Sequence, residues 1–307
     1  MGTRLSAEVD SQILRLHPPG QAHTLAGVIR PVDVLLEFLE AEHARGVTHV
    51  HLDEGARDGL RGLFNRVKHG VPAPAAPVAR IPEPMATPVI TEVKPTGGTR
   101  REQLDSLQIQ VEKSQPINAL GTLRETLVFS TGNPEAKVMF VGEAPGYLEE
   151  KERQPFVGPA GQKLSDILKA MGTARDEVYL TTLVKFRPAM AGQTTNNRKP
   201  SAAEIAACLP FLRAEIRIVQ PLCIVALGEG VAEGLLGLTG PIPFSRGSWH
   251  DFEGIPARVT YHPSTLLQTQ GVSTTKRQLW EDMLAVMEKI SLPISEKQRG
   301  FFLPKPA

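Results

Sequence analysis

The feature that most constrains the fold is an alternation of short apolar runs and amphipathic segments between residues 138 and 290. Four apolar runs have the length and composition of buried strands, at 138–141, 178–184, 222–227 and 255–261. Helical patterns follow them at 161–171, 202–219, 230–236 and 274–290. Strands that alternate with helices form a mainly parallel sheet covered on both faces. We therefore predict an α/β fold with three αβα layers around a central, mainly parallel sheet.

A proline-rich stretch at 71–99 divides the chain into two parts. Seven of the 26 prolines fall within it, and Gly97-Gly98 closes it. Because proline fixes φ and removes a backbone donor, the stretch is typical of a semi-extended linker; the alternative is a proline-rich ligand for a partner domain. We predict a small N-terminal module at 1–70, a linker at 71–99 and the main domain at 100–307. The role of the module is not indicated, and residues 1–99 are a candidate site for a protein partner.

Composition excludes several classes of protein. The 307 residues contain no apolar run of about 18 residues, the minimum for a membrane-spanning helix. The N-terminal residues carry Glu8 and Asp10 and lack the apolar core of a secretory signal, so we expect a cytoplasmic protein, and a monomer. Two cysteines exclude a four-cysteine metal site. With a net charge of +1, any contact with nucleic acid must come from local patches.

Three groups of motifs directly follow predicted strands, where parallel sheets bind ligands. The first strand leads into G-E-A-P-G at 142–146 and P-F-V-G-P-A-G at 155–161. Two carboxylates and an aromatic ring on such a tight loop indicate a site for a flat ligand and an activated water; the alternative is a turn with solvated glutamates. H-P-S at 262–264 presents backbone N–H groups suited to an anion. K-F-R-P at 185–188 precedes N-R-K-P at 197–200.

Together with A-L-G at 226–228, R-G-S-W at 246–249 and Y-H-P-S-T-L-L at 261–267, these motifs stand in an order that resembles the uracil-DNA glycosylase superfamily. The resemblance is closest to family 4 and covers about residues 104–287. It implies a uracil-DNA glycosylase-like fold for 100–307. It also implies an enzyme of base excision repair that acts on a base flipped out of DNA.

The resemblance also implies roles for individual residues. Glu143 and Glu149 would position or activate water, and His262 would donate a hydrogen bond to the base oxygen that gains negative charge. Phe156 would stack on the base, and Leu266 would wedge into the gap left by the flipped nucleotide. The implied base-binding residues are Gly142, Ala144, Pro145, Gly146, Phe156 and Thr182. The implied DNA-binding residues are Arg187, Arg198, Lys199, Pro263, Ser264 and Leu266.

The cysteines depart from the family pattern. Family 4 usually carries four cysteines that hold a [4Fe–4S] cluster, and here only Cys208 stands at a matching place. Phe186 replaces the cysteine of the usual K-C-R-P, and residues 114–118 contain no cysteine. Cys223 falls in an apolar strand. Because one thiol cannot hold the cluster, we expect neither an iron–sulfur cluster nor another metal or cofactor, and apolar packing around Phe186.

The second departure is Thr182, at a position where the family usually places an asparagine that reads the pyrimidine edge. Threonine has one hydroxyl and cannot present the paired donor and acceptor of an amide. Uracil recognition is weakened, or the preferred base differs, or activity is low. Thr181 would compensate only if the strand shifted by one residue, which would turn it to the other face. Arg153 also replaces a usual glycine, and the loop at 189–196 is longer than usual.

Three hypotheses for the function remain. The leading one is a monofunctional DNA N-glycosylase that hydrolyses the bond to uracil or another deaminated base and leaves an abasic site; no lysine is placed as a Schiff-base nucleophile. The alternative is a module that binds damaged or single-stranded DNA without efficient cleavage. The third is an unrelated α/β enzyme for free nucleotides, which the lack of a Walker A or G-x-G-x-x-G stretch disfavours. Base range and strand preference stay open.

Overall fold

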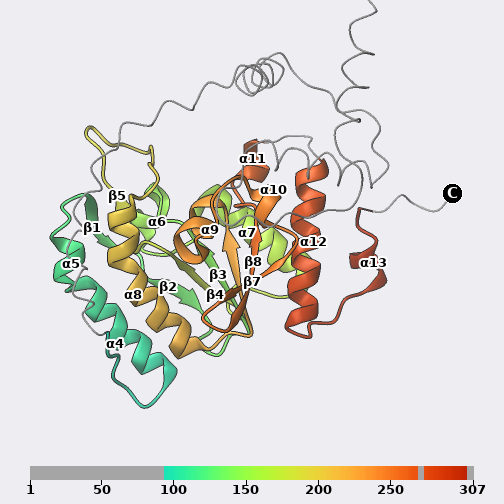
Figure 1. Ribbon diagram of the computed structural model, residues 1–307, viewed down its shortest axis with the longest axis horizontal. Helices are drawn as coiled ribbons and strands as arrows, with labels where there is room; N and C mark the ends of the chain where they lie inside the picture. The colour runs from blue at the N-terminus through green and yellow to red at the C-terminus, as the bar shows by residue number, and fades with distance from the viewer. Residues whose placement is uncertain (1–92, 269–272, 303–307) are drawn as a thin grey trace, which may run out of the picture. The chain divides into compact units, whose positions relative to one another are not determined.

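A six-stranded sheet forms the centre of the domain that the structure describes (Figure 1). The computed structural model describes residues 93–268 and 273–302. The strand order is β2-β4-β3-β6-β8-β7. The bounds are β2 (Ser130–Gly132), β3 (Val138–Gly142), β4 (Tyr179–Thr182), β6 (Cys223–Leu227), β7 (Trp249–Phe252) and β8 (Ile255–Thr260). The four inner strands are parallel, and β2 and β7 pair antiparallel at the edges, which confirms the predicted mainly parallel sheet.

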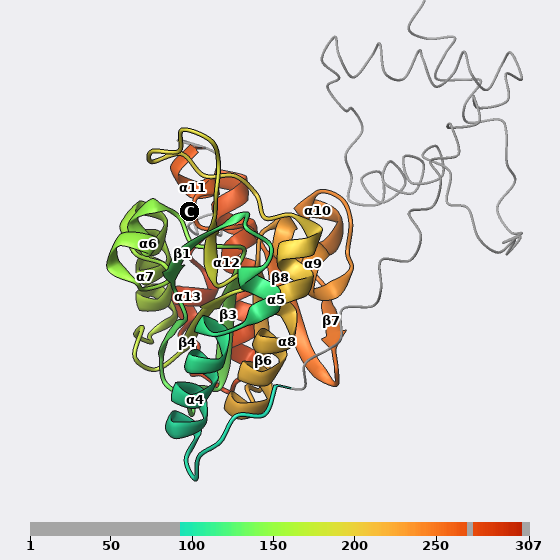
Figure 2. The same cartoon turned by 90° about the vertical axis from the view of Figure 1, so that its left-hand side faces the viewer.

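Helices cover both faces of this sheet, as the three-layer prediction required. One face packs against α4 (Arg100–Glu112), α5 (Gln115–Asn118), α8 (Ala202–Val219) and α9 (Glu229–Leu236). The other packs against α7 (Gly158–Met171) and α12 (Ser273–Lys289). In Figure 2, α4 and α8 lie toward the viewer. The remaining elements are α6 (Tyr147–Glu152), α10 (Ile242–Ser245), α11 (Thr265–Gln268), α13 (Glu296–Arg299) and a small sheet of β1 (Leu123–Leu127) and β5 (Phe186–Pro188).

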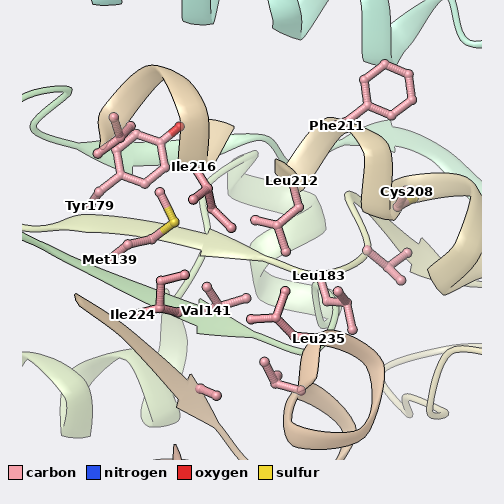
Figure 3. Close-up of a cluster of buried hydrophobic side chains, with 14 of the residues drawn as sticks. Met139, Val141, Tyr179, Leu183, Cys208, Phe211, Leu212, Ile216, Ile224 and Leu235 are labelled. Carbon is pink, nitrogen blue, oxygen red and sulfur yellow. The ribbon is translucent and has the colours of Figure 1, made fainter. Parts of the chain in front are cut away.

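Two hydrophobic cores result, because successive strand residues point to opposite faces of a sheet. In β3, Met139 and Val141 face the first core, on the side of α8 (Figure 3). Val138 and Phe140 face the second, on the side of α7 and α12. All four side chains are at most 2% exposed. The continuous apolar run that predicted a buried strand therefore contributes side chains to both cores.

The predicted strand at 178–184 ends earlier than expected, at Thr182. The next two residues turn toward the loop after β3, where the N–H of Leu183 donates to the carbonyl of Gly142 (2.7 Å) and that of Val184 to the carbonyl of Glu143 (3.0 Å). These bonds fix the end of β4 against the first motif. The short strands β1, β2, β5 and β7 were not predicted, because segments of three to five residues carry little periodic signal.

Residues 93–99, which the sequence assigns to the linker, contact the main domain. Val93 packs against the first core, and the Oγ1 of Thr96 lies 3.0 Å from the Oγ of Ser106. Thr99 caps α4, where Glu102 completes a capping box. The predicted module at 1–70 and the rest of the predicted linker lie outside the described residues. Within the described part of the chain, no helix is long and apolar enough to span a membrane.

Candidate active site

A cavity of about 1120 Å³ lies at the carboxyl ends of the parallel strands. The loops after β3, β6 and β8 and the last residue of β4 contribute to its lining, as expected for a parallel sheet. The three predicted catalytic residues line it: Glu143, Glu149 and His262. All the predicted base-binding residues line it as well: Gly142, Ala144, Pro145, Gly146, Phe156 and Thr182. Of the predicted DNA-binding residues, it includes Arg198, Lys199 and Ser264.

Phe156 forms an apolar wall of the cavity. Its backbone has a φ of 56°, an unusual conformation for a phenylalanine, which holds the ring close to the loop after β3. A Cβ atom added to Gly142 would lie 2.6 Å from the Cζ of this ring, so glycine is required there. The ring centroid lies 6.3 Å from that of His262, with the two planes tilted by 30°. The residue is 5% exposed and offers a flat surface for stacking.

His262 is a neutral hydrogen-bond donor that lines the same cavity. The backbone N–H of Ser264 donates to its Nδ1 (3.2 Å), and the Oγ of Ser264 lies 2.7 Å from the same atom. Since a backbone N–H can only donate, Nδ1 carries no proton, and the proton of the neutral ring is on Nε2. Burial lowers the pKa of His262 to about 4. At neutral pH the ring therefore has one N–H, on Nε2.

Glu143 occupies a space that a side chain on α9 would fill. A Cβ atom added to Gly230 would collide with the carboxyl group of Glu143. Burial raises the pKa of Glu143, and the positive charge of Lys199 acts in the opposite direction. Glu229 and Glu233 raise that pKa further. The site thus holds a carboxyl group that gains a proton more readily than one in water.

Glu149 lies on α6, at the other side of the G-E-A-P-G loop. Its Oε2 accepts a hydrogen bond from the backbone N–H of Gly146 (3.1 Å). Burial raises the pKa of Glu149, opposed by this backbone bond and by the charge of Arg187. A Cβ added to Gly146 would lie 2.7 Å from the Oε2 of Glu149 and 3.0 Å from the Nδ2 of Asn197. The carboxylate and the amide of Asn197 therefore face the same small space, where a water could be held.

Asn197 was not among the predicted site residues, although it immediately precedes Arg198 in the N-R-K-P motif. Its Oδ1 accepts a hydrogen bond from the Nε of Arg187 (2.9 Å), which turns the Nδ2 toward Gly146. The position in the motif was the only signal in the sequence. The orientation of the amide depends on a partner ten residues away, which spacing does not reveal.

Thr182 and Thr181 face opposite sides of the sheet. Thr182 lines the cavity, is 4% exposed, and its Oγ1 has no partner among the residues that the structure describes. Thr181 lies on the side of the first core, where its Oγ1 donates to the Oε2 of Glu215 (2.9 Å) beside a buried ion pair between Lys185 and Glu215 (2.6 Å). Thr181 is committed to this network, so it does not compensate for the missing asparagine.

Arg187 is buried, so its side chain does not lie at the surface where the sequence analysis expected a DNA contact. The side chain is 2% exposed, and its nitrogens donate to Glu150, to Asn197 and to the carbonyls of Thr194 and Asn196. A guanidinium with these partners cannot also bind a phosphate. Its structural effect is to hold the long loop at 189–196 against α6.

The other two basic residues predicted to bind DNA, Arg198 and Lys199, differ in their partners and in their exposure. Arg198 donates to the carbonyls of Ala189 and Thr122 and forms an ion pair with Glu204 (2.6 Å), so most of its donors also serve the fold. Lys199 is exposed at the cavity, near Glu143. Of the predicted basic contacts, Lys199 is the one best placed to meet a phosphate.

The H-P-S-T-L-L segment also differs from the prediction. Pro263 is buried, and Leu266 is only partly exposed because it packs against the second core. Neither residue lines the cavity, whereas Ser264, Thr265 and Leu267 do. Leu266 therefore lies on the side of the second core, and its role as a wedge stays a prediction.

The residues at the expected cluster position do not fit an iron–sulfur cluster. Ile117, Phe186 and Cys208 are all buried in the first core, with at most 3% exposed. Burial raises the pKa of Cys208 to about 11, which disfavours the thiolate that binds iron. Cys223 belongs to the second core, on the other side of the sheet. Within the described ranges, no three His, Cys, Asp or Glu side chains are grouped to hold a metal ion.

Comparison with known proteins identifies the class that this fold and site define. Residues 129–284 match the uracil DNA glycosylase superfamily. A type-4 uracil-DNA glycosylase of Thermotoga maritima is 37% identical over 190 residues, which cover 60% of this chain and 93% of that protein. A type-4 enzyme of Sulfurisphaera tokodaii is 36% identical over 183 residues (57% and 79%). A type-5 uracil-DNA glycosylase of Pyrobaculum aerophilum is 30% identical over 162 residues (47% and 69%).

The chain belongs to the uracil-DNA glycosylase superfamily. The resemblance to family 4 that the motifs predicted is confirmed by the type-4 relatives. The family match covers residues 129–284 and does not include the N-terminal segment.

Proposed function

We propose that this protein is a monofunctional DNA N-glycosylase that removes uracil, or another deaminated base, and leaves an abasic site. The type-4 relatives support this activity by their names. The observation that carries the proposal is the neutral His262, whose Nε2–H lies in the same cavity as the Phe156 ring. A ring face and a donor at the edge of one cavity suit a flat base with a carbonyl oxygen.

The chemistry follows from the charges that develop as the bond breaks. The departing base gains negative charge on its carbonyl oxygen, and the sugar gains positive charge. A fixed donor aimed at that oxygen stabilises the transition state more than the ground state. His262 acts in this way as a neutral donor, so it needs no proton from solvent and keeps its function well below neutral pH.

Water attack on the sugar requires a base, and the two carboxyl groups supply one. Glu149 is the better candidate for holding the water, because the amide of Asn197 faces the same space. Its raised pKa increases its strength as a base at neutral pH. Glu143 lies against α9, where its negative charge stabilises the cationic sugar.

Thr182 sets the base range in this proposal. A hydroxyl rotates and either donates or accepts a hydrogen bond, whereas an amide presents both at fixed positions. One hydroxyl therefore tolerates uracil and other deaminated bases, each bound with fewer hydrogen bonds than an asparagine would make. Lys199 and Ser264 would contact the DNA backbone, since both lie at the cavity.

The experiment is cleavage of oligonucleotides that contain a single uracil, hypoxanthine or xanthine, followed by alkali treatment. We expect strand breaks at uracil only after alkali, because hydrolysis leaves an abasic site. Breaks without alkali would indicate a lyase step, with Lys199 as the lysine at the cavity. His262→Ala should lower the cleavage rate by about 10²–10³-fold, the scale for losing one such donor. His250→Ala is the matched control, since His250 bonds to the carbonyl of Ser245 in the same chain.

The departure at Thr182 favours one second candidate, a module that binds damaged DNA without cleaving it. Tight binding to uracil-containing DNA, with no cleavage by the wild-type protein, would establish that alternative. The His262→Ala variant should bind DNA about as tightly as wild type whether the protein is a glycosylase or a binding module, because phosphate contacts dominate DNA affinity.

A further inference from the structure

An aromatic side chain that the proposed function does not use lies at the main cavity. Tyr147 is the first residue of α6, directly after the G-E-A-P-G loop, and it lines the cavity. The residue is 38% exposed, whereas Phe156 is buried. Within the described residues, Tyr147 is the only exposed aromatic side chain that lines this cavity. A ring that is open to solvent at the proposed DNA site is a candidate contact for the substrate.

Arg187 fixes the position of this ring. It belongs to β5, which lies beside α6 (Figure 1). Its guanidinium carbon lies 5.4 Å from the centroid of the Tyr147 ring. It also donates to Glu150 (2.9 Å), which is three residues along α6 and therefore on the same side of the helix as Tyr147. Because Arg187 is buried and bonded to two carbonyls of the loop at 189–196, the ring rests on a fixed support. Binding a ligand then costs little ordering of the tyrosine.

The surroundings of the ring indicate which ligand it suits. The guanidinium covers one face of Tyr147, so a flat group must approach from the other side. The flipped base already has a stacking surface in Phe156, inside the cavity. Lys199 is exposed at the same cavity and adds a positive charge. Aromatic rings together with positive charges are the means by which proteins bind single-stranded nucleic acid.

We propose that Tyr147 stacks on the base of a nucleotide next to the flipped one, and that it thereby selects single-stranded DNA as the substrate. The inference rests on the proposed function and deepens it by assigning a strand preference. In a duplex the neighbouring bases stay paired and stacked on one another, so the ring gains no partner. In a single strand they are free to turn onto the ring. Every base has a π face, so this contact carries no sequence preference.

The test uses single-stranded oligonucleotides with one uracil, flanked on both sides either by ordinary nucleotides or by tetrahydrofuran abasic analogues. For wild type, we expect removal of the flanking bases to lower kcat/KM by about tenfold, the scale of one base–aromatic stack. Tyr147→Ala should show that loss with ordinary flanks and no further loss with abasic flanks. The loss should appear in KM rather than in kcat, because the contact is the same before and during bond cleavage.

Three control variants define which property of the side chain matters. Tyr147→Phe keeps the flat ring and should restore the wild-type response, whereas Tyr147→Leu keeps apolar bulk without a flat face and should resemble Tyr147→Ala. Leu222→Ala truncates an exposed side chain that does not line the cavity and should leave the response unchanged. The ratio of single-strand to duplex kcat/KM should fall about tenfold in Tyr147→Ala. Equal losses on both substrates, or a Tyr147→Ala variant that still responds to the flanking bases as wild type does, overturn the proposal.

A binding measurement separates this proposal from the function on which it rests. The probe is a single-stranded oligonucleotide that carries 2′-fluoro-2′-deoxyuridine, whose glycosidic bond resists hydrolysis, and its Kd is measured by fluorescence anisotropy. We expect the Kd of wild type, but not that of Tyr147→Ala, to rise when the flanking bases are removed. A wild-type Kd that does not depend on the flanking bases overturns the stacking proposal, whether or not uracil is cleaved. The expected Kd pattern without cleavage of uracil overturns the glycosylase function alone.

Discussion

Replacing Thr182 by valine and by asparagine tests how the cavity reads its base. The Oγ1 of Thr182 is buried and has no partner in the described structure, and β4 holds the residue directly beside Gly142. Valine keeps the shape but removes the hydroxyl. An unsatisfied buried polar group costs about 1–3 kcal/mol, so Thr182→Val should be more stable than wild type. For a domain of this size, each kcal/mol raises the Tm by about 2–4 °C.

Activity should change in the opposite direction. If the hydroxyl bonds to the base in the transition state, valine loses about 1–1.5 kcal/mol and cleavage slows by about tenfold. Asparagine presents a donor and an acceptor together, so Thr182→Asn should cleave uracil about tenfold faster than wild type. A more stable but slower valine variant is the signature of a polar group retained for function.

The assay is single-turnover cleavage of a uracil oligonucleotide, with thermal denaturation of each variant alongside. A valine variant that cleaves uracil at the wild-type rate would refute the view that Thr182 contacts the base. An asparagine variant that is well folded but no faster would show that Thr182 does not limit uracil recognition. In that case hypoxanthine and xanthine substrates decide whether another base is preferred.

Three further outcomes are expected. The acid limb of the pH–rate profile should lie at a higher pH than an ordinary glutamate would give, since burial raises the pKa of Glu149 and the rate falls as its carboxylate gains a proton. Glu149→Gln should abolish this limb, and a limb removed only in a His262 variant would contradict the assignment. The purified protein should contain no stoichiometric iron and show no visible absorption band, which metal analysis checks directly. A protein that starts at residue 93 should stay folded and bind DNA, because Val93 and Thr99 remain in place; its unfolding would show that the predicted N-terminal module shares the core.

The sequence was sufficient for the sheet and for the location of the cavity. Buried parallel strands are continuous apolar runs, which stand out in a single sequence, and their carboxyl ends meet at one edge. Glu143 follows β3 and His262 follows β8, so both had to lie at that edge. The backbone-paired ends of β3 and β4 brought Gly142 and Thr182 together for the same reason.

The direction in which individual side chains point could not be predicted from the sequence in the same way. Arg187 stands in a motif expected to contact DNA, but its donors are used by a loop that follows it in the chain. Leu266 and Leu267 are chemically identical, and only the packing against α7 and α12 distinguishes them. Such choices depend on contacts between distant segments, which spacing along one chain does not encode.

The charge state of His262 shows why contacts that the sequence does not reveal matter for the mechanism. The sequence places a histidine at the cavity, and a histidine with its ordinary pKa would be partly charged near neutral pH. The backbone N–H of Ser264 takes the lone pair of Nδ1, and burial lowers the pKa to about 4. Protonation of Nδ1 would break the hydrogen bond from the backbone N–H of Ser264, because both nitrogens would then be donors. Burial therefore keeps the ring neutral, and the backbone N–H of Ser264 places its one proton on Nε2, so the fold fixes both the charge and the tautomer of the donor.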